Sequence, residues 1–334
     1  MRTSASLAGI LATVISSSAA PTTLEELNSH LFTNAVIVWQ APTNRLADSF
    51  WVYQRRLPRV FSATVISNAI VLGSLQDKGF PKPSTDETCI MAEPPCPCAN
   101  ICNFFINPAD AVMSFTSPSY KDGSPEGIPT DQAIAQRAWK YTVQLGLDPA
   151  YLTQKSFFTH LYNPDPDGKG ATNIICGRGI FLPRQLDGVS FFSADDEGDG
   201  AEGFSIEFGG HGQIRYFCLR WSNVERHESQ KTASPEEIIS CIKAHKTIVL
   251  PNAGEETFFA RLTKLASAKK LIITKITPYY GAGVFGEMPT NDVPCNFTTP
   301  FAELEAVAEF GGSNATLQLV SPILSSEVSR LLAK

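Results

Sequence analysis

The sequence predicts an α+β fold, in which helices pack on antiparallel sheets in two successive units that follow an N-terminal α/β region. Three observations support this prediction. Apolar residues recur at helical spacing after Thr130, and runs that alternate between apolar and polar residues follow them. A helix followed by strands recurs from Ser234. Between these two patterns, the glycine-rich segment 209–212 joins two alternating runs, which is typical of a β-hairpin.

Residues 20–120 form the first region, which mixes helix and strand signals. Short apolar runs predict buried strands, and the face shared by Val65, Ala69 and Leu72 predicts a helix. The segment Lys78–Asn103 is predicted to be a loop because it is rich in proline, which cannot donate a hydrogen bond to a strand ladder. The predicted elements are strands at Ala35–Trp39, Ser49–Tyr53 and Ala111–Phe115 and a helix at Ser62–Leu75.

Residues 130–230 form the second region. Thr130 is suited to cap a helix, because its hydroxyl can accept a hydrogen bond from a backbone N–H of the first turn. Gly146 is placed to end this helix in the left-handed conformation. The helix buries the stripe Ile134, Ala138, Tyr141 and Leu145. Strands are predicted at Ser156–Tyr162, Ile174–Leu182, Gly188–Ser193, Gly203–Phe208 and Gln213–Trp221.

Residues 231–334 form the third region. Ser234, Pro235 and Glu237 make a capping box with proline in the first helical position, which is a strong signal for a helix start. Strands are predicted at Leu271–Thr277 and Ala315–Ser321, whereas Phe301–Phe310 is ambiguous between helix and strand. The Gly-, Ser- and Pro-rich segment 117–129 is the predicted domain boundary. Because a helix followed by strands occurs twice, the sequence suggests an internal duplication of architecture.

The N-terminus predicts export. Residues 1–19 combine Arg2, a short apolar core at Leu7–Ile15 and small residues at Ser17–Ala19, which is the order found in a signal peptide. This core is shorter than the roughly 20 apolar residues that cross a bilayer, and no later segment approaches that length. We therefore expect a secreted, periplasmic or cell-envelope protein without a membrane span.

The charge of the chain argues against a nucleic-acid partner. The formal net charge is −6 over 334 residues. The densest basic spots, Gln54–Arg56 and Lys269–Lys270, are too short for a nucleic-acid footprint. No phosphate-binding or dinucleotide-binding glycine motif occurs between a predicted strand and helix, so we expect no cofactor.

The eight cysteines are the densest chemical feature. Four of them, Cys89, Cys96, Cys98 and Cys102, lie in the proline-rich loop and could hold zinc, but their spacing lacks the paired Cys-x2-Cys knuckles of a structural zinc site. An even number of cysteines in an exported chain favours disulfides. The disulfide candidates are Cys89, Cys96, Cys98, Cys102, Cys176, Cys218, Cys241 and Cys295.

Two acidic loops have the alternating oxygen ligands with which a calcium-binding loop begins. In each loop the twelfth position, Ile174 or Ile206, holds no carboxylate, so turns between strands explain them more simply. The candidate calcium ligands are Asn163, Asp165, Asp167, Asp195, Glu197 and Asp199.

Residues 130–221 resemble the PepSY and propeptide-type domains of secreted bacterial proteins. The resemblance is carried by the helix TDQAIAQRAWKYTVQLGL, the segment GIFLPRQLDGVSFF and the strand GQIRYFCLRW. It implies a helix paired with a curled antiparallel sheet, and a role in inhibiting, chaperoning or regulating a partner. The acidic insertion Asp195–Glu202 interrupts the family's pattern, and no protease domain follows in this chain.

The sequence therefore favours a secreted, non-catalytic protein that binds, inhibits or regulates an unknown protein or cell-surface partner. Aromatic residues of the hairpin, such as Tyr216 and Trp221, could contribute to binding, although most aromatic residues of such strands lie in a core. The alternative is an exported hydrolase whose acid/base pair comes from residues such as Asp187, Glu202 and Glu207. The partner, the substrate and the disulfide connectivity do not follow from the sequence.

Overall fold

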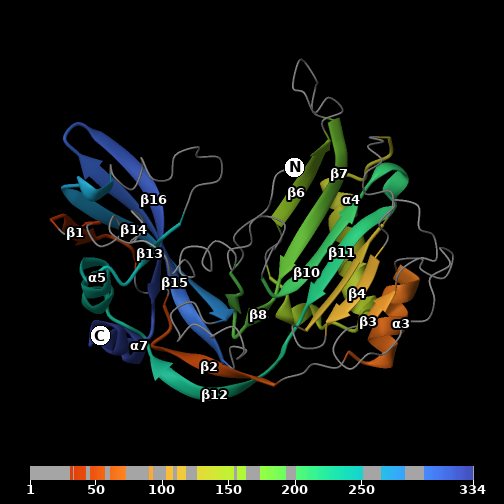
Figure 1. Ribbon diagram of the computed structural model, residues 1–334, viewed down its shortest axis with the longest axis horizontal. Coiled ribbons are helices and arrows are strands. Elements are labelled where there is room, and N and C mark those ends of the chain that lie inside the picture. The colour runs from red at the N-terminus through yellow and green to blue at the C-terminus, as the bar shows by residue number, and fades with distance from the viewer. Residues whose placement is uncertain are drawn as a thin grey trace, which may run out of the picture. The chain divides into compact units, whose positions relative to one another are not determined.

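The fold is mostly β, so the predicted α+β class is wrong. The computed structural model (Figure 1) contains two seven-stranded sheets, and among the residues that it describes 53% lie in strands and 24% in helices. The four α-helices of the described residues are short: α3 (Ala63–Leu72), α4 (Asp131–Gln144), α5 (Pro235–Lys243) and α7 (Ser325–Leu332). The structure describes residues 31–32, 34–42, 46–56, 61–72, 90–92, 103–107, 111–117, 126–153, 156–162, 174–192, 201–250, 265–282 and 297–333.

The chain forms two compact units, and the first is inserted into the second. Unit 1 is built from Arg56–Asn223, whereas unit 2 combines Val224–Lys334 with strands that precede Arg56. This division differs from the predicted domains. The boundary predicted at 117–129 lies inside unit 1, because strands on both of its sides pair in one sheet. The predicted first region is divided between the two units.

The sheet of unit 1 is antiparallel, with the strand order β3-β4-β5-β11-β10-β7-β6. Its hairpin β10–β11 is the one that the glycines of 209–212 predicted, and β6 has the predicted bounds. A short hairpin, β8 (Gln185–Leu186) with β9 (Val189–Ser190), stands beside it. The strands of the main sheet are β3 (Ile90–Ala92), β4 (Asn103–Asn107), β5 (Val112–Thr116), β6 (Ser156–Tyr162), β7 (Ile174–Pro183), β10 (Gly203–Phe208) and β11 (Ile214–Arg220).

Helix α4 covers one face of this sheet and has the predicted ends. The Thr130 hydroxyl accepts a hydrogen bond from the Ala133 N–H, and Gly146 adopts φ +73° after the last turn. The N–H groups of Gly146 and Leu147 donate to the carbonyls of Val143 and Thr142, which completes a Schellman motif. These bonds satisfy backbone groups that a helix end would otherwise leave without partners.

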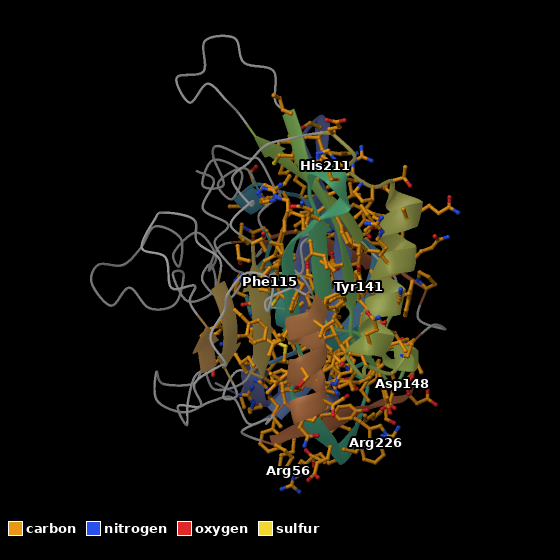
Figure 2. The ribbon with its side chains drawn as sticks, turned by 90° about the vertical axis from the view of Figure 1, so that its right-hand side faces the viewer. Arg56, Phe115, Tyr141, Asp148, His211 and Arg226 are labelled. Atoms are coloured by element: carbon orange, nitrogen blue, oxygen red, sulfur yellow. The ribbon has the colours of Figure 1, made fainter. Side chains whose placement is uncertain are left out.

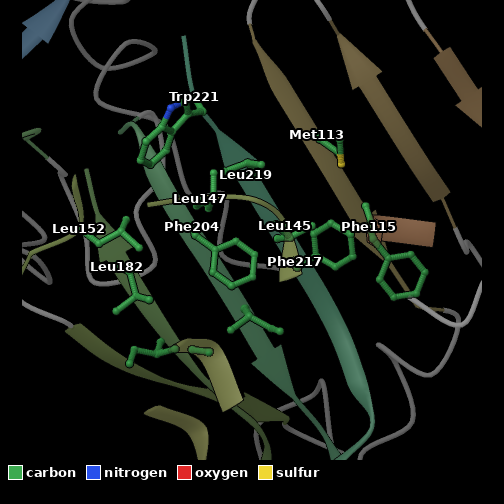
Figure 3. Close-up of a cluster of buried hydrophobic side chains, with 14 of the residues drawn as sticks. Met113, Phe115, Leu145, Leu147, Leu152, Leu182, Phe204, Phe217, Leu219 and Trp221 are labelled. Carbon is green, nitrogen blue, oxygen red and sulfur yellow. The ribbon is translucent and has the colours of Figure 1, made fainter. Parts of the chain in front are cut away.

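The core of unit 1 lies between α4 and the sheet. Alternate residues of β10 and β11, including Phe204, Phe217 and Leu219, are fully buried there with Ile134 and Ala138 of α4. Figure 3 shows Phe204, Phe217 and Leu219 together with Met113 and Phe115 of the neighbouring strand β5. The aromatic residues of the hairpin are therefore core residues: Phe204, Phe208, Phe217 and Trp221 are buried, and Tyr216 is half-buried.

The tip of the β10–β11 hairpin is held against the rest of unit 1 (Figure 2). His211 adopts a left-handed conformation, and its N–H donates to the Glu126 carbonyl at 2.7 Å. Arg137 of α4 donates to the Gly212 carbonyl at 3.2 Å and lies over the Phe208 ring. Tyr141, one turn further along α4, stacks on the same ring at 6.3 Å between centroids.

The sheet of unit 2 has the order β1-β14-β15-β16-β13, and β2 pairs with both β15 and β12. Strand β1 runs parallel to β14, with Val36 opposite Lys270. Its strand order differs from that of unit 1, so the architecture is not duplicated. The strands are β1 (Val36–Trp39), β2 (Ser49–Arg56), β12 (Asn223–Lys231), β13 (Ile248–Val249), β14 (Lys270–Ala282), β15 (Phe297–Phe310) and β16 (Ser313–Pro322).

Helices α5 and α7 pack against each other, and α5 also contacts β16. The predicted capping box is present: the Ser234 hydroxyl accepts from the Glu237 N–H, and the Glu237 carboxylate accepts from the Ser234 N–H at 2.7 Å. The segment left ambiguous by the sequence is strand β15, in which Leu304, Ala306 and Ala308 are buried and the residues between them are half-buried. This period of two is that of a strand with one covered face.

Candidate functional site

Glu207 and Arg215 form an ion pair inside unit 1. Their side chains are each 2% exposed, and Arg215 Nη1 lies 3.1 Å from Glu207 Oε1. His160 Nδ1 lies 3.4 Å from the other carboxylate oxygen, and the His160 side chain is 30% exposed. Arg215 also donates to the Cys176 carbonyl at 2.6 Å. A buried charge pair needs such additional partners to offset the loss of hydration.

Two β-bulges position this pair. In β10–β11, Glu207 faces Tyr216 and Phe208 faces Ile214, so Arg215 is an extra residue in its strand. In β6–β7, His160 faces Gly177 and Leu161 faces Ile175, so Cys176 is an extra residue as well. A bulge redirects the side chain at the break in the ladder. At these breaks, ionisable side chains from β6, β10 and β11 come together, and β7 lies between β6 and β10.

Two glycines leave the space that the ion pair occupies. A Cβ on Gly177 would overlap the Glu207 carboxylate and lie 2.7 Å from Arg215 Nη1. A Cβ on Gly209 would overlap the aliphatic part of the Arg215 side chain. Real Cβ atoms do not approach other atoms so closely, so these positions require glycine for reasons of space.

A second buried pair joins Arg184 to Glu202 at 2.5 Å, and both side chains are less than 10% exposed. Arg184 also donates to the Ser222 carbonyl at 2.7 Å, and Ser222 donates through its hydroxyl to Glu202. The guanidinium lies 4.4 Å from the centre of the Trp221 ring, which is the geometry of a cation–π contact. The pair fixes the segments before β10 and after β11.

The structure does not bring the predicted acid/base candidates together. Glu202 and Glu207 are five residues apart along extended chain, so their Cα atoms are about 16 Å apart at roughly 3.3 Å per residue. A glycosidase pair needs its carboxyl groups roughly 5–9.5 Å apart. Asp187 is exposed in the β8–β9 turn with φ +50°. Each buried glutamate is instead the partner of an arginine.

In unit 2, a carboxylic acid lies buried between α5 and α7. Burial raises the pKa of Glu327 to about 7, and the Arg330 guanidinium at 3.7 Å opposes that shift. Oε2 of Glu327 has no hydrogen-bond partner within the described part of the chain. Burial, and next the charges of Glu327 and Glu237, raise the pKa of the Cys241 thiol to about 11. This thiol is therefore a poor nucleophile at neutral pH.

Unit 2 also contains an open cavity of about 360 Å³, within the usual size range of small-molecule sites. Its lining comes from segments that lie far apart in the sequence: the end of β1, the segment before β2, the end of β12 and the first turn of α5. The apolar lining residues are Trp39, Leu46, Ala47, Ala233, Pro235 and Ile238.

Backbone and side-chain hydrogen bonds hold the walls of this cavity together. The Thr232 N–H donates to the Asp48 carbonyl at 2.9 Å, and the Thr232 hydroxyl donates to the Ala47 carbonyl at 2.5 Å. Trp39 donates through its indole N–H to the Ala41 carbonyl at 2.9 Å. Two exposed charged side chains, Asp48 and Lys231, also line the cavity.

Three of the cysteines predicted to form disulfides are thiols in the structure. Cys176 and Cys241 are buried, Cys218 is half-buried, and none of the three is bridged. The expected set of four disulfides is therefore not formed. Each of the three cysteines lies within a strand or on a helix, where an unbridged thiol packs like a small apolar side chain. The other five, Cys89, Cys96, Cys98, Cys102 and Cys295, lie outside the described residues.

The predicted calcium ligands, Asn163, Asp165, Asp167, Asp195, Glu197 and Asp199, also lie outside the described residues, as does the predicted signal peptide 1–19. Within the described ranges, no group of three or more His, Cys, Asp or Glu side chains is placed to hold a metal ion. None of the helices that the structure describes is long and apolar enough to cross a bilayer.

Neither a protein-family model nor a curated protein sequence matches the chain. The functional conclusion therefore depends on the residues themselves. Sequence reasoning missed the cavity, because its lining residues are close only after β1 pairs with β14 and β12 pairs with β2. The signal in the sequence was the capping box at Ser234, which placed the start of α5 but not its neighbours.

Proposed function

We propose that this chain is a secreted binding protein without catalytic activity, and that it holds its ligand in the cavity of unit 2. The observation that carries the proposal is the lining of that cavity. One indole and five aliphatic side chains make it mainly apolar, and two exposed charged side chains complete the lining. Sites that bind small molecules combine an apolar surface with a few polar groups that set orientation.

The use of charged residues in unit 1 supports binding rather than hydrolysis. Glu202 and Glu207 are each neutralised by an arginine and buried against it. A general acid or base must reach the substrate through solvent or through a cleft. A carboxylate held in a buried ion pair instead fixes the positions of the strands around it.

The predicted signal peptide 1–19 supports export, and the resemblance of residues 130–221 to PepSY and propeptide-type domains fits a role in binding a partner. Export is tested by the mass and N-terminal sequence of the protein made in its native host. A chain that begins near Ala20 supports secretion, whereas a chain that retains Met1 contradicts it.

Ligand binding is tested by screening a fragment library against the purified full chain with ligand-observed NMR. The variant Ala47→Trp places a large side chain at the cavity, and because Ala47 is exposed the variant should fold. We expect cavity ligands to lose binding in this variant. The matched control is Val143→Trp, at a position of α4 that is 61% exposed and belongs to unit 1.

Fragments that bind the wild type and the Val143→Trp protein, but not the Ala47→Trp protein, would support the proposal. The absence of any fragment with this pattern would contradict it. Turnover of ester, glycoside or peptide substrates by the wild type, lost in Glu207→Gln with folding preserved, would favour the hydrolase alternative.

A further inference from the structure

We infer that the ligand of the unit 2 cavity is a small zwitterion with an apolar side chain, of the amino-acid class. This inference rests on the proposed function, because it specifies what the same cavity binds. It follows from the charges at the cavity and from the surfaces next to them.

The first step concerns Asp48 and Lys231. Both line the cavity, both are exposed, and neither forms an ion pair with any residue that the structure describes. They are opposite charges that line one cavity without forming an ion pair with each other. Elsewhere in unit 2, exposed opposite charges do join, as in Lys275 with Glu305 at 2.6 Å.

The charge of the ligand follows from these two side chains. A simple anion would be attracted by Lys231 and repelled by Asp48, and a simple cation would meet the reverse. A ligand that carries an ammonium and a carboxylate on the same carbon atom satisfies both groups. Its net charge of zero also removes the cost of bringing one unbalanced charge to the opening.

The third step concerns the rest of the ligand. The lining beyond the charged pair is the indole of Trp39 and the aliphatic groups of Ala233, Pro235 and Ile238. The Trp39 N–H already donates to the Ala41 carbonyl, so its ring is left as an apolar surface. An aromatic or branched aliphatic side chain gains free energy by leaving water for such a surface.

Several hydrogen-bond donors near the cavity already have acceptors within the protein, which favours recognition of the ligand by charged side chains. The Thr232 N–H and hydroxyl both donate hydrogen bonds to backbone carbonyls of the segment before β2. At the start of α5, the N–H groups of Ser234 and Glu237 are satisfied by the capping box. These donors therefore do not orient a ligand, whereas the side chains of Asp48 and Lys231 can.

The test is isothermal titration calorimetry of the purified full chain with three probes of similar shape. L-Phenylalanine carries both charges, 3-phenylpropionate lacks the ammonium, and 2-phenylethylamine lacks the carboxylate. We expect phenylalanine to bind about fivefold more tightly than either analogue, the factor that corresponds to one exposed charge contact of about 1 kcal/mol.

Two variants assign each charge. In Asp48→Asn, we expect phenylalanine and 3-phenylpropionate to bind equally, because the group that recognises the ammonium is gone. In Lys231→Gln, we expect phenylalanine and 2-phenylethylamine to bind equally for the complementary reason. L-Leucine and L-tryptophan extend the test to other apolar side chains.

The outcomes separate this inference from the proposed function. If fragments bind in a manner sensitive to Ala47→Trp but the zwitterion has no advantage over its analogues, the inference is wrong and the binding function stands. The same conclusion follows if such fragments bind and none of the three amino acids does. If no small molecule binds the cavity, both proposals fall together.

Discussion

Arg215 reaches Glu207 because it is the extra residue of a β-bulge: Glu207 faces Tyr216, Phe208 faces Ile214, and the residue between them turns its guanidinium to within 3.1 Å of the carboxylate. In a strand without the bulge, Arg215 and Phe217 would point to the same face of the sheet, which is the face that α4 covers. The break in the ladder and the ion pair therefore depend on each other.

Gly177→Ala should destabilise the protein by about 2 kcal/mol or more, because the new methyl group would overlap the Glu207 carboxylate in a packed region. Urea denaturation followed by fluorescence measures the change in the free energy of unfolding. Gly311→Ala is the control, since a Cβ there meets no atom within 4 Å. Equal stability of the two variants would show that the region around the ion pair can relax.

Arg215→Met should cost about 3–5 kcal/mol, because it leaves Glu207 buried without its main counter-charge. The double variant Glu207→Leu with Arg215→Met should be more stable than the sum of the two single changes predicts. Chemical denaturation of all four proteins gives the coupling free energy. Simple additivity of the two effects would mean that the pair contributes no interaction of its own.

Glu327 should make unit 2 less stable as the pH rises. Its pKa is about 7 in the folded state, above the ordinary value of 4.5, so folding favours the protonated form. The stabilisation is complete below about pH 4.5 and is lost as the pH rises through 7. By linkage, the free energy of unfolding should fall by roughly 2–3 kcal/mol between pH 5 and pH 8 from this group alone.

Glu327→Gln removes this titration, so its stability should exceed that of the wild type at pH 8 and depend less on pH. Denaturation midpoints at pH 5 and pH 8 provide the comparison. Glu309→Gln, at a glutamate whose side chain is 36% exposed, should retain the pH dependence of the wild type. Parallel curves for the wild type and Glu327→Gln would contradict the assignment.

The thiol of Cys241 should resist alkylation in the native protein. Its side chain is fully buried, and its pKa of about 11 leaves little thiolate at pH 8. Peptide mapping after iodoacetamide treatment, with and without urea, measures the labelling. We expect slow labelling of Cys241 that becomes fast on unfolding, whereas half-buried Cys218 serves as the internal comparison. A disulfide-linked Cys241 peptide would overturn the assignment of this residue as a thiol.

Local signals in the sequence predicted local structure well. The caps of α4 and α5 and the bounds of β6 match because each depends on residues close in the chain. Strand β12 was missed, since its sequence NVERHESQK is mostly exposed and carries no apolar alternation. Strand β3 lies inside the segment predicted to be a loop. The prolines of that segment argued against strands, but three of its residues pair with β4.

The predicted fold class was wrong because helix caps are easier to recognise than strands. Residues 301–310 contain alternating glutamate and aliphatic residues that suit either structure, and the pairing of β15 with β14 and β16 decides for a strand. The cavity was beyond prediction for a related reason. Its walls come from segments near Trp39 and Lys231, which only long-range strand pairing brings together.

The insertion of unit 1 into unit 2 has a consequence for the order of events during synthesis. Every strand of the unit 1 sheet has left the ribosome once Arg220 has, so that sheet can form early. Strand β2 can pair with β12 directly after unit 1, but β1 must wait for β14, its partner near the other end of the chain. Until then the edge of β1 stays open to other chains, as does the edge of β2 that later pairs with β15. Translation that stops after unit 1 should therefore release a folded sheet whose N-terminal extension has unpaired strand edges. Such a chain would need a chaperone to prevent its aggregation.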